Sequence, residues 1–220
     1  MLEQNNEKTS VLLELLKKRY PKIKTALENW KKDYELLFCI ILSAQSTDKQ
    51  INKITKNLFQ KFPTLASFAN CELKDLEEEI FSSGFYKSKA KSIKSASNYI
   101  LENFGGKVPK KIDELVKIPG VARKTANVFL SVFFDDNEKI ANQGIAVDTH
   151  VKRVSSRLGL TKNSDPEKIE QDLLEIIPQK DWGRFSLSLV QFGRDICQAR
   201  NPKCEICELR KICDFIATAE

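Results

Sequence analysis

The sequence predicts an all-helical fold made of two helical lobes. Apolar residues recur at the three- and four-residue spacings of a helix face in several separate segments. A β-branched run of the kind found in strands occurs only at residues 145–147, which is too short to build a sheet. With 220 residues, 41% of them apolar, the chain is long enough for one large or two modest domains with buried cores.

The N-terminal part shows the helical pattern plainly. Leu12, Leu15 and Leu16 share one helix face, and Pro21 ends that pattern because proline cannot continue a helix. The pattern resumes after Asp33 at Leu36, Leu37, Ile40 and Ile41. We therefore expect one helix before Pro21 and a second, largely apolar one after Asp33.

The segment Ile118–Ala126 reads Ile-Pro-Gly-Val-Ala-Arg-Lys-Thr-Ala and predicts a tight turn directly before a helix. Gly120 suits the turn, and Lys124 falls in the first turn of the helix. Backbone N–H groups at a helix start point outward, and the helix dipole makes that end partly positive, which favours a bound phosphate. This hairpin can therefore hold a phosphate beside a lysine nucleophile.

A polar, helix-poor interruption at residues 135–144 separates the two expected lobes. We place one domain at residues 26–140 and the other at residues 1–25 together with 141–220. Beyond the interruption, Val151, Val154 and Leu158 predict a further helix. Asp148 directly precedes that stripe, where an aspartate commonly caps a helix start.

Positive charge is concentrated around the hairpin. The whole chain has a net charge of +6, yet Lys87–Lys124 alone contains ten basic and three acidic residues. Such a concentration favours a polyanionic partner such as nucleic acid, although lysine-rich stretches often only solvate helix faces. The first residues are polar and no apolar run is long enough to cross a membrane, so we expect a cytoplasmic protein without a signal peptide.

Four cysteines lie in the last 24 residues with the spacing C-x6-C-x2-C-x5-C: Cys197, Cys204, Cys207 and Cys213. They predict one metal centre, because disulfides are disfavoured in a reducing compartment. Zinc and an iron–sulfur cluster both remain open, since only one cysteine pair has the short spacing typical of zinc sites. The other two cysteines, Cys39 and Cys71, are expected to be structural free thiols.

In combination, these motifs resemble the endonuclease III family of helix-hairpin-helix DNA glycosylases. The matching motifs are the Lys124 hairpin, Val147-Asp148-Thr149-His150-Val151, the four cysteines, and Leu42-Ser43-Ala44-Gln45-Ser46-Thr47-Asp48. The resemblance implies a six-helix barrel carrying the hairpin in one lobe. It also implies that Cys197, Cys204, Cys207 and Cys213 bind a [4Fe–4S] cluster in the other lobe.

The resemblance further implies a base-excision repair glycosylase with AP lyase activity, acting as a monomer in the nucleoid. Its partner would be duplex DNA with an oxidised pyrimidine or an abasic site. Lys124 would form a Schiff base with the sugar, and β-elimination would then cut on the 3′ side. Asp148 would stabilise the developing positive charge, while His150 is expected to pack or form hydrogen bonds without a catalytic role.

DNA contacts are implied at several further positions. Gln45 would fill the gap left by an extruded base, and Phe85 would wedge against the opposite strand. Without the resemblance, a core aromatic would be the more probable role for Phe85. The remaining expected contacts are Lys89, Gly120, Ala122 and Arg123 near the hairpin, and Arg200 and Lys203 in the cysteine loop.

Two rival functions stay open. An adenine-specific mismatch glycosylase of the same superfamily shares the cysteine spacing but typically lacks the hairpin lysine. A non-catalytic DNA-binding module would use the hairpin, the basic segment and the cluster for recognition alone. Ala122 also departs from the family pattern, which often has a second glycine there and so lets a phosphate approach more closely.

Overall fold

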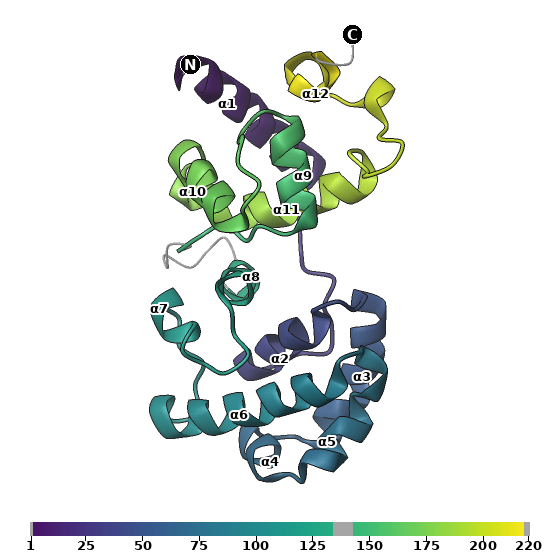
Figure 1. Cartoon of the computed structure of the whole chain (residues 1–220), viewed down its shortest axis with the longest axis vertical. Helices are drawn as coiled ribbons and strands as arrows, with labels where there is room; N and C mark the ends of the chain where they lie inside the picture. The colour runs from purple at the N-terminus through teal and green to yellow at the C-terminus, as the bar shows by residue number, and fades with distance from the viewer. Residues whose placement is uncertain (1, 134–142, 218–220) are drawn as a thin grey trace. The chain divides into compact units, whose positions relative to one another are not determined.

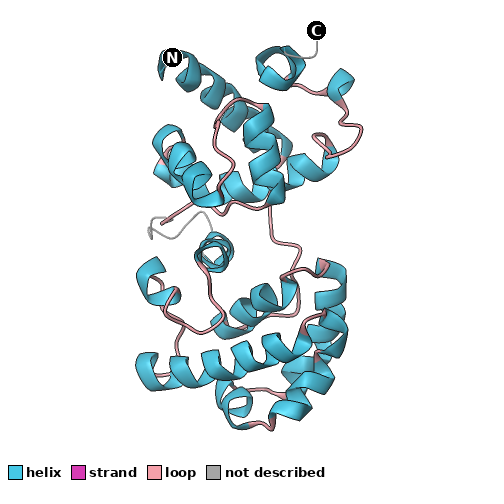
Figure 2. Ribbon diagram, viewed as in Figure 1, coloured by secondary structure: helices cyan, strands magenta, loops and turns pink. Residues whose placement is uncertain are grey.

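The computed structural model describes residues 2–133 and 143–217, and every regular element in these two ranges is helical (Figures 1 and 2). The predicted all-helical class is thus confirmed. Of the expected interruption at residues 135–144, only Gln143 and Gly144 lie within the described residues. In this described part, no helix is long and apolar enough to span a membrane.

The α-helices are α1 (Leu2–Arg19), α2 (Asp33–Ser43), α3 (Asp48–Lys61), α4 (Leu65–Asn70), α5 (Leu73–Glu79), α6 (Tyr86–Phe104), α7 (Ile112–Leu115), α8 (Arg123–Phe133), α9 (Thr149–Arg157), α10 (Pro166–Ile176), α11 (Trp182–Asp195) and α12 (Asp214–Ala217). Short 3₁₀ helices are η1 (Phe81–Ser83), η2 (Gln179–Asp181), η3 (Cys204–Ile206) and η4 (Arg210–Ile212). The chain divides into two compact units, which we call the hairpin unit (Thr25–Phe133) and the cysteine unit (Met1–Lys24 with Phe134–Glu220).

Helix α2 forms the centre of the hairpin unit. Nine of its eleven residues are buried, which is typical of a helix enclosed on all sides. It packs against α3, α6 and α8. On one side the Phe38 ring meets the Phe68 ring edge-on, with centroids 5.0 Å apart. The hairpin helix α8 therefore packs directly against the core of this unit.

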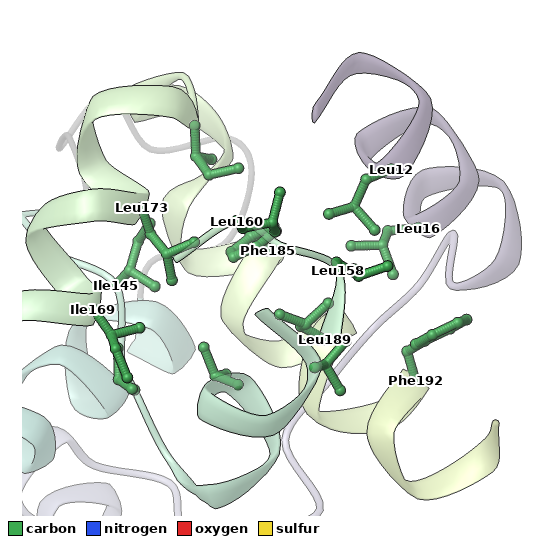
Figure 3. Packing of buried hydrophobic residues seen from close by; sticks show 14 of the residues in the cluster. Leu12, Leu16, Ile145, Leu158, Leu160, Ile169, Leu173, Phe185, Leu189 and Phe192 are labelled. Atoms are coloured by element: carbon green, nitrogen blue, oxygen red, sulfur yellow. The ribbon is translucent and has the colours of Figure 1, made fainter. Parts of the chain in front are cut away.

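In the cysteine unit, buried side chains of α1 pack with those of α9, α10 and α11 (Figure 3). Leu12 and Leu16 supply the α1 face that the sequence predicts. The β-branched stretch at residues 145–147 has no regular structure, and the side chains of Ile145 and Val147 are buried in this core. Its backbone is held partly by the Ala146 N–H, which donates to Ser186 Oγ at 3.0 Å. The stretch is thus a core-filling segment rather than a strand.

Candidate active site

The predicted turn before a helix is present at Ile118–Ala126. Gly120 adopts φ +80°, and the Val121 N–H donates to the Ile118 carbonyl at 3.0 Å to close the turn. Helix α8 begins at Arg123, so Lys124 is its second residue, and the Lys124 side chain is exposed. The N–H groups of this first turn point along the helix axis, where they can meet an anion.

Gly120 is required by space as well as by its backbone angle. A Cβ at this position would lie 2.6 Å from Ser92 Cβ on α6. We therefore expect Gly120→Ala to destabilise the protein by at least about 1 kcal/mol, because the left-handed conformation is itself costly for alanine. Chemical denaturation would measure this loss. Gly106→Ala is the matched control, since it has a similar φ of +83° but its Cβ would make only an ordinary 3.6 Å contact.

Gln45 and Phe85 are exposed at two loop tips of the hairpin unit. Gln45 follows the end of α2, and Phe85 lies between η1 and the start of α6. The Phe85 side chain is 68% exposed, so it is not the core aromatic that residue statistics favour. Both residues have left-handed backbones, with φ of 54° at Gln45 and 49° at Phe85. Ala122, just before α8, is exposed as well.

Lys89 is buried, which does not support the direct DNA contact expected of it. Its side chain is only 6% exposed, and Nζ donates to the Leu42 carbonyl at 2.7 Å and to the Ser83 carbonyl at 2.8 Å. Burial lowers the pKa of this amine below its usual value. In the sequence, Lys89 lies in a basic stretch. In the structure, its side chain lies on the face of α6 that is buried within the hairpin unit.

Asp148 caps α9, as its position in the sequence predicts. Its Oδ1 accepts from the backbone N–H groups of His150 and Val151, both at 2.8 Å. Within the described residues, no hydrogen bond involves Oδ2. A carboxylate fixed through one oxygen can present the other to a proton or to a developing positive charge.

His150 is held inside the cysteine unit by Arg153. Arg153 Nη2 lies 3.1 Å from His150 Nδ1 and donates to the Gly193 carbonyl at 3.0 Å. Because a guanidinium only donates hydrogen bonds, His150 Nδ1 would be the acceptor in this contact. Burial is the largest cause that lowers the His150 pKa; Arg153 lowers it further and Asp148 opposes the shift. These contacts match the expected packing and hydrogen-bonding role.

The four C-terminal cysteines line one pocket, whose walls include Val154, Leu158, Phe192 and Ile196. All four are free thiols. Burial raises the pKa of the Cys207 and Cys213 thiols, and the nearby sulfurs of Cys197 and Cys204 raise it further. Among the described residues, no three Cys, His, Asp or Glu side chains converge as they would around one metal ion. Cys39 is buried apart from this pocket, as expected for a structural thiol.

Arg157 holds the loop between Cys197 and Cys204. Its guanidinium donates to Cys197 Sγ at 3.4 Å and to the carbonyls of Gln198 at 2.7 Å and Ala199 at 3.1 Å. Arg200, next along the loop, is exposed, and so is Lys203. This role of Arg157 was not expected from the sequence. Arg157 lies four residues after Arg153 on the helix that Asp148 caps, so both arginines share one helix face. This spacing is visible in the sequence.

The hairpin, the two tips and Lys89 thus belong to the hairpin unit, while Asp148 and the cysteines belong to the cysteine unit. A family model described as "HhH-GPD superfamily base excision DNA repair protein" matches residues 38–179. The chain belongs to this superfamily. It is a base-excision repair enzyme, a bifunctional DNA glycosylase and AP lyase.

Relatives and solved structures agree with this membership in the HhH-GPD superfamily. Endonuclease III of Synechocystis sp. is 45% identical over 213 residues, which are 97% of this chain and 94% of that protein. Endonuclease III of Bacillus subtilis is 44% identical over 181 residues, covering 82% and 80% of the two chains. A non-covalent Endonuclease III–DNA complex superposes with a TM-score of 0.87 at 36% identity, with 97% of each chain covered. A trapped Endonuclease III–DNA covalent intermediate gives 0.86 at 37% identity, covering 96% of this chain and 98% of that one.

Proposed function

We propose that this glycosylase removes oxidised pyrimidines from duplex DNA and cleaves the resulting abasic site through a Schiff base on Lys124. The observation that carries the proposal is the placement of Lys124: an exposed amine on the first turn of α8, directly after the Gly120 turn. A phosphate bound at this helix start would bring the adjoining sugar close to the amine. One chain contains all the residues named below, so we propose that it acts as a monomer on chromosomal DNA.

In the proposed reaction, Lys124 Nζ attacks C1′ of the damaged nucleotide, and the C1′–N bond to the base breaks. The departing base takes that electron pair together with a proton. Ring opening converts the adduct into a protonated Schiff base, which makes the C2′ proton acidic. Loss of that proton expels the 3′ phosphate, and water then hydrolyses the Schiff base to free the lysine. These steps require no oxidant or reductant.

We assign Asp148 to charge stabilisation and proton transfer at the same sugar. Its cap bonds use Oδ1 alone, which supports a role for Oδ2 beyond the cap. A negative oxygen near C1′ favours the cationic character that develops as the base departs. Gln45 and Phe85 are assigned to the space left by the extruded base and to the opposite strand, respectively, because both are exposed at loop tips. Contacts with DNA are proposed for the hairpin residues Gly120, Ala122 and Arg123, and for Arg200 and Lys203.

We propose further that Cys197, Cys204, Cys207 and Cys213 bind a [4Fe–4S] cluster. The four thiols line a single pocket without converging on the position of one ion, which suits a cofactor larger than zinc. When bound, the cluster supplies iron–thiolate bonds that cross-link the loop carrying Arg200 and Lys203. Arg157 already fixes the first half of that loop through its three hydrogen bonds.

Iron content tests the cluster assignment. We expect the purified protein to contain about four iron atoms per chain and to absorb visible light. Cys204→Ser should lose the iron and the colour. The control is Cys71→Ser, which removes a thiol outside the pocket and should leave both unchanged. A colourless protein that contains zinc would contradict the assignment.

Borohydride trapping tests the activity. Borohydride reduces a Schiff base to a stable amine, so the protein should become covalently attached to duplex DNA that contains an oxidised pyrimidine or an abasic site. An undamaged duplex of the same sequence is the control and should give no adduct. Binding to damaged DNA without trapping would contradict the proposed Schiff base on Lys124.

A further inference from the structure

Lys89 is a buried cation that the proposed reaction does not use. It lies near the start of α6, where the exposed lysines Lys87 and Lys91 flank it in the sequence. Burying an ammonium group costs free energy unless hydrogen bonds compensate for the lost water. The structure supplies that compensation with two backbone carbonyls, those of Leu42 and Ser83.

The two carbonyls belong to the two segments that end in exposed tips. Leu42 is in the last turn of α2, three residues before Gln45. Ser83 ends η1, two residues before Phe85. Carbonyls in the last turn of a helix have no partner within the helix and form its partly negative end, so a cation is favoured there. One ammonium group therefore binds the base of both tips, although they are far apart in the sequence.

Both tips also have a backbone that needs support. Gln45 and Phe85 have left-handed φ values of 54° and 49°, which are uncommon for residues other than glycine. Such conformations persist where the surrounding structure holds them. A second hydrogen bond reaches η1 from α3, the helix that follows the Gln45 tip, because Gln50 Nε2 donates to Ser82 Oγ at 2.6 Å. Unlike Lys89, this pair is exposed.

We propose that Lys89 is a positioning residue that fixes the Gln45 and Phe85 tips relative to each other, so that both engage the duplex at one lesion. The inference rests on the proposed function, in which these tips enter the DNA. Lys89 acts through its hydrogen bonds to the two carbonyls and does not touch DNA itself. It thereby contributes to recognition of the lesion rather than to general attraction for DNA.

Lys89→Met tests this role, since methionine fills a similar volume but cannot donate to the carbonyls. The matched control is Lys91→Met, which removes the same charge from an exposed position on the same helix. Affinity would be measured over a range of salt concentrations for an intact duplex and for the same duplex with an abasic-site analogue. We expect Lys89→Met to keep wild-type affinity and salt dependence on the intact duplex. Its preference for the abasic duplex should fall by about ten- to a hundredfold.

A double-mutant cycle with Phe85→Ala separates positioning from a general loss of stability. If Lys89 acts through the tip, adding Lys89→Met to Phe85→Ala should cost clearly less than it costs in the wild type. Thermal unfolding would establish a temperature at which all four proteins are folded. Fluorescence of a base analogue opposite the abasic site would report how far the strand is unstacked, and Lys89→Met should reduce this signal.

Three results would overturn the inference. In the first, Lys89→Met weakens both duplexes equally and lowers the salt slope by about one, as loss of a phosphate contact does. In the second, the preference for the abasic duplex is unchanged. In the third, the Lys89 and Phe85 effects are additive. A wild-type protein with no preference for the abasic duplex would overturn the proposed function itself, and the inference with it.

Discussion

Lys124→Gln should abolish borohydride trapping and slow strand cleavage by at least about a thousandfold, equivalent to roughly 4 kcal/mol of barrier. The amide of glutamine cannot form a Schiff base, so the covalent step has no nucleophile. Because Lys124 is exposed on the first turn of α8, the substitution should leave the fold unchanged. Trapping and single-turnover cleavage of an abasic duplex would measure both losses.

Lys117→Gln is the matched control for this result. Lys117 is also exposed, lies before the same hairpin, and loses the same charge on substitution. It should trap and cleave like the wild type, with at most a small loss of affinity at higher salt. Trapping that survives in Lys124→Gln would show that another amine is the nucleophile and would refute the proposed mechanism.

Asp148→Asn should lower base excision by about a hundred- to ten-thousandfold, the usual contribution of a positioned acid or base. Asparagine caps a helix about as well as aspartate does, so Oδ1 can still accept from the His150 and Val151 N–H groups. The free energy of unfolding should therefore change little. Single-turnover excision of an oxidised pyrimidine and chemical denaturation would measure the two quantities on the same protein.

Asp148→Ala completes the comparison, because alanine removes both the charge and the cap. We expect it to lose excision to the same extent and also about 1 kcal/mol of stability. Activity equal to wild type in Asp148→Asn, with a loss confined to Asp148→Ala, would assign Asp148 to the cap alone.

The features predicted correctly from sequence are local ones. The end of α1 before Pro21, the start of α2 at Asp33 and the Gly120 turn follow from residues close to one another in the chain. The same holds for the Asp148 cap, where side-chain and backbone partners are two and three residues apart. Local hydrogen bonds and steric limits depend on residues that are close together in the chain, so they can be predicted from the sequence.

Long-range contacts decided the remaining features. Lys89 lies in the same basic stretch as Lys87 and Lys91, yet it alone of the three reaches two carbonyls of the protein's own backbone. Phenylalanine is usually a core residue, but Phe85 is exposed, because it lies at the loop tip between the end of η1 and the start of α6. In the same way, Arg157 reaches the loop after Cys197, about forty residues further along the chain.

The sequence by itself determined the helical class, the Gly120 turn with Lys124 on the helix after it, the capping aspartate and the grouping of four cysteines. Only the tertiary structure decided which basic side chains face solvent and which hold the molecule together. The physical reason is that a lysine's charge is visible in the sequence, but its partners depend on which backbone carbonyls folding brings within reach. For Lys89, those carbonyls are at the bases of the two tips proposed to enter the DNA.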